Sequence, residues 1–155
     1  MGGVTPACLM PLVIVAIALA LPAAAAAADP VHFTTPSGNI DCVGGFDTPG
    51  ASVDCLVEKN SWPKLPKRPA NCDLDWVGSE ISLTNGKVRV GACRGDIGPL
   101  CAPGTDRCTV LAYGKSVLIK RSIRCTSRRT GLTCRARKGL GAGFRVSRQG
   151  YTIFS

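Results

Sequence analysis

Cysteine residues constrain the fold of this chain more than any other feature of the sequence. The 155 residues include nine cysteines, of which Cys8 lies near the amino terminus and eight lie in residues 29–155. An even number of cysteines in a small exported domain predicts a disulfide framework, here of four bonds. With one histidine and no two cysteines separated by two residues, we expect neither a metal site nor a cofactor. The eight cysteines are Cys42, Cys55, Cys72, Cys93, Cys101, Cys108, Cys125 and Cys134.

The amino-terminal segment has the composition of a signal peptide. Residues 1–28 carry no charged side chain, and an apolar run from Leu9 is interrupted by Pro22 and followed by alanines up to Ala28. We therefore predict a signal peptide at residues 1–28, cleaved before Asp29, that directs the protein out of the cell or to the extracellular face of the envelope. The alternative is an uncleaved helix that anchors the protein, since about twenty apolar residues can span a bilayer.

Residues 29–155 are predicted to form a single all-β domain. No stretch shows sustained helical periodicity, and glycines and prolines separate short runs rich in β-branched residues. This pattern favours a small antiparallel sandwich or barrel built of hairpins. The strongest signal is Asn85-Gly86 between alternating apolar residues, which predicts a hairpin that pairs Leu83 with Val88 and Ile81 with Val90.

Hairpin geometry also predicts which cysteines are bonded, although eight cysteines allow 105 pairings. Residues 40–42 and 53–55, and likewise 123–125 and 132–134, look like hairpins with one cysteine on each strand. These patterns pair Cys42 with Cys55 and Cys125 with Cys134. Cys101 and Cys108 enclose a short loop-like hexapeptide and should pair locally, which leaves Cys72 with Cys93.

Two further segments have predictable backbone structure. Pro63, Pro66 and Pro69 recur every three residues between lysines and an arginine, which indicates an extended surface connection over residues 59–72. A last hairpin is predicted around Gln149-Gly150, with Val146 opposite Ile153.

Several short segments resemble those of a known family. In order they are Phe33 with residues 35–42 (TPSGNIDC), 53–55 (VDC), Cys72 with Asp75-Trp76, 93–96 (CRGD), 111–114 (LAYG), 125–127 (CTS), 131–134 (GLTC), and 143–144 (GF) with Ser147-Arg148. In these segments the chain resembles a family of small exported actinobacterial cysteine-rich proteins of unknown function. The resemblance implies secretion and one disulfide-bonded domain, and it implies no activity. Cys101 and Cys108 are an additional pair beyond the six cysteines of that family, which supports a bond between them.

Charge is distributed unevenly along the chain and suggests a binding function. Residues 29–106 have seven basic and ten acidic side chains, whereas residues 107–155 have twelve basic side chains and no acidic one. Such a field attracts anionic polymers of the envelope or lipid headgroups, and we expect no specific binding of nucleic acid. The alternative is that the two halves neutralise each other in the folded domain. We expect a monomer whose anion-binding residues are Arg128, Arg129, Arg135, Arg137 and Lys138.

Other patterns favour catalysis or adhesion less strongly. Asp73, Asp75 and Glu80 lie near Trp76, and a pair of carboxylates there could hydrolyse glycosides. The glycines at 139, 141 and 143 are more typical of a turn than of a phosphate-binding loop, and Arg94-Gly95-Asp96 spells an adhesion tripeptide that also occurs by chance. We therefore predict a non-enzymatic binding domain. The alternative is an extracellular hydrolase, or a protease inhibitor that acts through an exposed loop such as residues 59–71.

Overall fold

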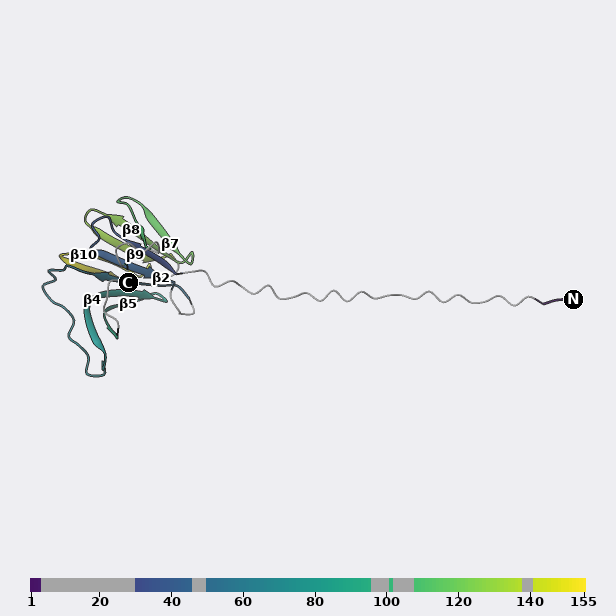
Figure 1. The fold of residues 1–155 in the computed structure, drawn as a ribbon, viewed down its shortest axis with the longest axis horizontal. Helices are drawn as coiled ribbons and strands as arrows, with labels where there is room; N and C mark the ends of the chain where they lie inside the picture. Colours follow the sequence, from purple (N-terminus) through teal and green to yellow (C-terminus); the bar gives the residue numbers. More distant parts are fainter. Residues whose placement is uncertain (4–29, 46–49, 96–100, 102–107, 138–140) are drawn as a thin grey trace.

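Two β-sheets account for the strands that the structure describes. The computed structural model describes residues 1–3, 30–45, 50–95, 101, 108–137 and 141–155, and within these ranges all regular structure is β-strand. The prediction of an all-β, disulfide-bonded sandwich is confirmed (Figure 1). Within the same ranges no helix is long and apolar enough to cross a membrane. The predicted signal peptide and its cleavage site lie almost wholly outside the described residues and stay predictions.

All described strands of the first sheet precede those of the second along the chain. The first sheet has the order β5-β4-β3-β2-β1-β6, with β1 (Val31–Thr34), β2 (Ile40–Gly44), β3 (Ser52–Val57), β4 (Asp75–Thr84), β5 (Lys87–Arg94) and β6 (Cys108–Val110). The second has the order β11-β10-β9-β8-β7, with β7 (Ser116–Ile119), β8 (Ile123–Arg128), β9 (Gly131–Ala136), β10 (Gly143–Ser147) and β11 (Gly150–Phe154). Figure 1 shows β7 to β10 side by side in one layer and β2, β4 and β5 in the other.

The hairpin formed by β4 and β5 has the predicted register. Leu83 pairs with Val88 and Ile81 with Val90, and Asn85 and Gly86 form the turn with φ angles of 50° and 76°. Asparagine and glycine tolerate this left-handed conformation better than other residues, so the turn determines the register. Ile81 and Leu83 are fully buried against the second sheet.

Apolar side chains from both sheets meet in the core. Phe33, Val53 and Leu83 from the first sheet share it with Leu132 and Phe144 from the second, and all five are at most 1% exposed. These residues alternate along their strands with outward-facing ones, as expected for a sandwich.

Two of the four disulfide bonds lie inside this core. Cys42 is directly opposite Cys55, and Cys125 is directly opposite Cys134, so each bond joins neighbouring strands of one sheet. All four cysteines are fully buried. The other bonds join Cys72 to Cys93 and Cys101 to Cys108, so the structure contains the four predicted pairs.

One strand pairing departs from the predicted antiparallel arrangement. β6 runs parallel to β1, with His32 opposite Cys108 and Thr34 opposite Val110. A parallel pair cannot be closed by a tight turn and therefore leaves no local signal in the sequence. β6 follows β5 along the chain but lies at the opposite edge of the sheet.

The predicted register of the last hairpin is wrong by two residues. Val146 pairs with Tyr151, and Ile153 pairs with Phe144. The turn consists of Arg148 and Gln149, whereas the prediction placed Gln149 and Gly150 there. Ser147 explains the shift, because its Oγ accepts a hydrogen bond from the backbone N–H of Gln149 at 3.2 Å and so closes the turn one residue earlier.

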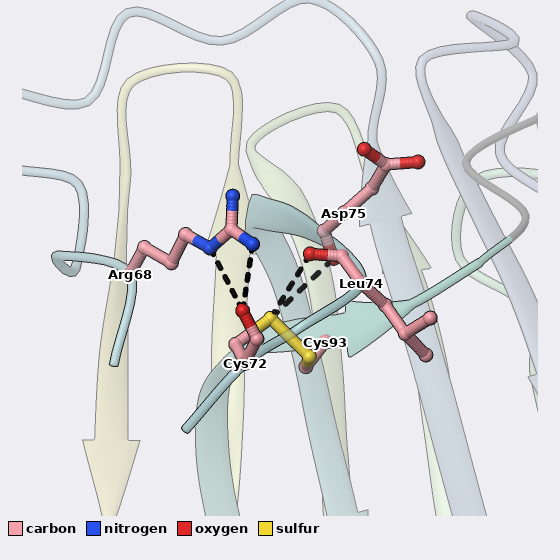
Figure 2. The surroundings of a disulfide bond; sticks show 5 residues. All are labelled: Arg68, Cys72, Leu74, Asp75 and Cys93. Atoms are coloured by element: carbon pink, nitrogen blue, oxygen red, sulfur yellow. Dashed lines mark hydrogen bonds between the residues drawn. A yellow bond between two sulfur atoms is a disulfide. The ribbon is translucent and has the colours of Figure 1, made fainter. Parts of the chain in front are cut away.

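The long connection between β3 and β4 is an extended surface segment that is anchored at several points. The ring of Trp62 is buried, and the indole N–H of Trp76 donates a hydrogen bond to the carbonyl of Pro66 at 2.9 Å. Arg68 donates from Nε and Nη2 to the carbonyl of Cys72, at 3.0 and 2.6 Å (Figure 2). The bond between Cys72 and Cys93 then ties the end of the connection to β5.

Candidate functional site

Five turns and connections meet at one end of the sandwich and line a pocket of about 330 Å³. We call it the loop-end pocket. Its walls come from the β1–β2 turn, the start of the β3–β4 connection, the β6–β7 connection, and the β8–β9 and β10–β11 turns. The lining residues are Thr35, Ser37, Asn39, Ile40, Lys59, Tyr113, Arg128, Arg129, Thr130, Gly131, Ser147, Arg148 and Gln149.

Hydrogen bonds within the β1–β2 turn determine the shape of the first wall. The N–H of Gly38 donates to the carbonyl of Thr35 at 2.8 Å, and Gly38 has a φ of 63° that glycine adopts without strain. The N–H of Thr35 donates to the carbonyl of Ile40 at 3.0 Å. Thr35 Oγ1 also lies 3.2 Å from Ser37 Oγ and accepts a hydrogen bond from the N–H of Ile40 at 3.3 Å, so backbone and side chains together close the turn.

Asn39 holds Lys59 at the rim through two hydrogen bonds. Its Nδ2 donates to the carbonyl of Lys59 at 3.1 Å, and its Oδ1 accepts from the N–H of Lys59 at 2.9 Å. The carbonyl of Asn39 also accepts from the N–H of Glu58 at 3.0 Å. One amide side chain thus fixes the point at which the β3–β4 connection leaves the sheet.

The same connection positions the β10–β11 turn. The N–H of Ser61 donates to the carbonyl of Arg148 at 2.8 Å, and the indole N–H of Trp62 donates to the carbonyl of Ser147 at 2.9 Å. The Trp62 ring also packs against Tyr151, with ring centroids 4.8 Å apart. Arg148 therefore lies in a turn of the second sheet that hydrogen bonds from the β3–β4 connection of the first sheet hold in place.

The β8–β9 turn contributes two further arginines. Arg128 pairs with Gly131 at the end of the hairpin, and the guanidinium of Arg129 lies 5.3 Å from the centre of the Tyr113 ring. This geometry is within the range of a cation–π contact and orients Arg129 beside the pocket. The Nη2 of Arg145, on the neighbouring strand β10, donates to the carbonyl of Thr130 at 3.3 Å and so supports the β8–β9 turn.

The charge of the loop-end pocket is entirely positive among the described lining residues. Lys59, Arg128, Arg129 and Arg148 are cationic, and no carboxylate lines the pocket. None of the four forms an ion pair with another described residue; the ion pair of the described region joins Arg94 to Glu80. The lining is otherwise rich in hydroxyl and amide groups, so the pocket can accept an anion together with neighbouring polar groups.

The structure brings together two of the five predicted anion-binding residues and separates two others from them. Arg128 and Arg129 line the loop-end pocket, whereas Arg135 lies four residues along β9 from Gly131, about 13 Å away at the rise of a β-strand. Arg137 follows β9 at that far end, and Lys138 lies outside the described residues. The turn of a hairpin and its open end lie at opposite ends of the two strands, which explains why Arg135 and Arg137 are far from Arg128 and Arg129.

A separate polar cluster lies on the outer face of the first sheet. Burial raises the pKa of Asp41, Asp54, Glu58 and Glu80 above their ordinary values, with the nearby Arg94 opposing this rise for all but Asp41. Glu80 and Arg94 form an ion pair of 2.9 Å, Nε to Oε2. We call these four acids the outer-face carboxylates. Asp41 and Glu80 are buried and Asp54 is partly buried, whereas Glu58 is exposed. The ion pair gives Glu80 and Arg94 a structural role within the fold.

The predicted acidic cluster around Trp76 is divided by the structure. Asp75 and Trp76 line a depression of about 350 Å³ together with Glu58, whereas Glu80 is paired with Arg94. Figure 2 shows the Asp75 carboxylate directed away from the disulfide bond of Cys72. Trp76 also has a structural role, through its hydrogen bond to the carbonyl of Pro66.

The remaining patterns have local structural roles where they are described. Gly141 and Ala142 lead into β10, and the carbonyl of Ala142 accepts a hydrogen bond from the N–H of Ala136 at 2.8 Å. Residues 138–140 lie outside the described ranges, and so does Asp96 of the Arg94-Gly95-Asp96 tripeptide.

These observations define a disulfide-bonded β-sandwich domain whose turns enclose a cationic pocket. The chain belongs to DUF6636, a family of unknown function, whose model matches residues 13–154. No curated protein and no solved structure matches the chain. The match confirms membership in a family of unknown function; export and actinobacterial origin stay predictions.

Four segments that carry the family resemblance meet at the loop-end pocket. The lining residues that they supply are Thr35, Ser37, Asn39, Ile40, Tyr113, Gly131, Ser147 and Arg148. Charge along the sequence identified Arg128 and Arg129 but not Lys59, Asn39 or Arg148, which come from distant turns. Asn39 and Arg148 lie within those segments, whereas Lys59 lies outside all of them.

Proposed function

We propose that this protein is a secreted or envelope-associated binding domain, without catalytic activity, whose loop-end pocket holds an anionic group of an envelope polymer. The observation that carries the proposal is the convergence of Lys59, Arg128, Arg129 and Arg148 on one polar pocket without a lining carboxylate. The four disulfide bonds fit an oxidising, extracellular location.

Physical chemistry favours an external anion at this position. Cations held close together by fixed turns repel one another, and a bound carboxylate or phosphate relieves that repulsion. The planar guanidinium of arginine matches such groups with two parallel hydrogen bonds, which is why arginine is preferred for their recognition. At physiological ionic strength exposed charges are screened beyond about 8 Å, so cations grouped within one pocket act on the same anionic group.

Retention on an immobilised acidic polymer tests this proposal. We expect protein purified from the full chain under non-reducing conditions to bind polygalacturonate and to elute at a salt concentration that falls strongly in the variant Arg128→Ser/Arg129→Ser. Its melting temperature should change little, because exposed charges contribute little to stability. The matched control is Lys87→Ser/Arg89→Ser, which removes the same charge from exposed positions on the first sheet.

Two results would overturn the proposal. One is elution of the unaltered protein at low salt, like a neutral protein, since the charges of the two halves would then compensate each other. The other is an equal loss of retention in both double variants, which would show an effect of net charge alone.

A second candidate function is glycoside hydrolysis in the depression beside Trp76. Glu58 and Asp75 line it together, and burial raises the pKa of Glu58, as a general acid requires. We expect Glu58→Gln and Asp75→Asn each to abolish any release of reducing sugar from envelope polysaccharide. Activity that survives in both variants would refute this assignment.

A further inference from the structure

The outer face of the second sheet carries four exposed arginines. Cys125, Cys134 and Val146 point into the core, so the residues that alternate with them point outward. We call this surface the arginine face; its cations are Arg124 and Arg128 on β8, Arg135 on β9 and Arg145 on β10.

Two of these arginines are placed against each other at a cost to stability. Arg124 is directly opposite Arg135 in the β8–β9 register. Like charges at directly opposite positions of a sheet are destabilising, and residues 107–155 contain no acidic side chain to compensate them. Arg135 lies 3.8 Å from the centre of the Phe154 ring and donates to the carbonyl of Gly141 at 3.2 Å. The Arg124 guanidinium has no hydrogen bond or ion pair with another described residue.

Hydroxyl groups lie between the cations. The row next to the Arg124–Arg135 pair contains Thr126 opposite Thr133, and Thr126 also shares a 2.8 Å hydrogen bond with Ser116. Arg145 belongs to the same row, directly opposite Thr133. The face thus alternates guanidinium groups, which bind carboxylates, with hydroxyls that both donate and accept hydrogen bonds.

The arginine face is continuous with the loop-end pocket. Arg128 belongs to both, and Arg145 donates a hydrogen bond to the carbonyl of Thr130, which lines the pocket. Arg124 and Arg128 are separated by four residues, or about 13 Å along β8. The combined surface is therefore much longer than one small anion requires.

We propose that the arginine face and the loop-end pocket together bind a linear acidic polysaccharide, with the chain lying across β8 to β10 and one unit in the pocket. The inference rests on the proposed function, because the pocket supplies one end of the binding surface. Carboxylates of the polymer pair with the arginines, and its sugar hydroxyls pair with the threonines between them. A polymer of phosphate alone would accept hydrogen bonds from those hydroxyls but could donate none to them.

Binding of galacturonate oligomers of two lengths tests the proposal. We expect the full chain, purified under non-reducing conditions, to bind a dodecamer more tightly than a trimer, and both more tightly than linear polyphosphate of equal charge. Arg124→Thr should weaken dodecamer binding about two- to fivefold, the range for an exposed ion pair, and leave trimer binding unchanged. The same variant should melt at an equal or higher temperature, because it removes the repulsion between Arg124 and Arg135.

The matched control is Arg89→Thr, which makes the same substitution at an exposed strand position on the first sheet and should leave both affinities unchanged. Arg145→Thr is the second variant on the arginine face and should weaken dodecamer binding as Arg124→Thr does.

Equal affinity for the two oligomers would overturn the proposal that the binding surface extends along the arginine face, and would leave the proposed binding in the loop-end pocket intact. Tighter binding of polyphosphate would overturn the polysaccharide assignment. If Arg128→Ser/Arg129→Ser leaves trimer binding unaltered, the proposed function itself fails.

Discussion

Replacement of Gly91 by alanine tests how the β3–β4 connection is fixed to the first sheet. Gly91 lies on β5 with a φ of 82°, and a Cβ atom built there would overlap ring carbons Cζ2 and Cη2 of Trp76. The Trp76 ring lies across the glycine while its N–H holds the carbonyl of Pro66. Gly91 is therefore required both for its backbone conformation and for the space above it.

The expected loss of stability has three contributions. The left-handed conformation costs a residue with a Cβ about 1–2 kcal/mol, and overpacking against the ring costs about 1–3 kcal/mol. Displacement of Trp76 also breaks its hydrogen bond to Pro66, worth about 1 kcal/mol. We expect Gly91→Ala to lower the free energy of unfolding by about 3–6 kcal/mol.

Gly86→Ala is the matched control, because Gly86 has a φ of 76° and nothing within contact distance of its missing Cβ. This variant should lose only about 1–2 kcal/mol. Both values are measured by urea unfolding under non-reducing conditions, with tryptophan fluorescence reporting the displacement of Trp76. If the two variants are destabilised equally, Trp76 does not lie across Gly91 and the reasoning is refuted.

Three further predictions concern buried groups. Because burial raises the pKa of Glu80, the folded state binds the proton of this carboxyl more tightly than the unfolded state does. Protonation of Glu80 therefore stabilises the fold; the contribution is complete below the ordinary pKa of 4.5 and is lost as the pH rises through the raised pKa. The stability of the unaltered protein relative to Glu80→Gln should therefore fall between pH 4 and pH 7 in urea titrations, and a rise would contradict it. Cys42→Ala/Cys55→Ala opens a loop of 13 residues and should cost about 3 kcal/mol by the same method, with a loss below about 1 kcal/mol as the contrary result. Ser127→Ala should raise the melting temperature or leave it unchanged, because the buried Ser127 hydroxyl has no hydrogen-bond partner among the described residues; a clear decrease would reveal one.

Local turn chemistry determined how much of the fold could be predicted from the sequence. Asn85-Gly86 is suited to one type of turn, so the register of its hairpin followed directly. The last hairpin has no such signal, and the bond from the Gln149 N–H to Ser147 Oγ moved its turn by one residue. The parallel pairing of β6 with β1 joins segments about 75 residues apart and depends on tertiary packing.

The candidate site was predictable only where its residues are neighbours in sequence. Arg128 and Arg129 share one turn and stand out by charge. Lys59 reaches the same pocket because the Asn39 side chain holds its backbone, and Arg148 because Ser61 holds its carbonyl. Contacts of this kind join residues 20 or more positions apart and are not encoded in any local pattern.

The two core disulfide bonds constrain the order in which the protein acquires its structure. Cys42–Cys55 and Cys125–Cys134 are sealed between the sheets with no exposed surface, so neither an oxidant nor a reducing thiol can reach their sulfur atoms once the sandwich has closed. Thiol exchange requires direct attack on sulfur. Oxidation must therefore precede closure, while each hairpin is still open to its surroundings. Afterwards the lifetime of both bonds in a reducing environment is governed by the rate at which the whole domain opens.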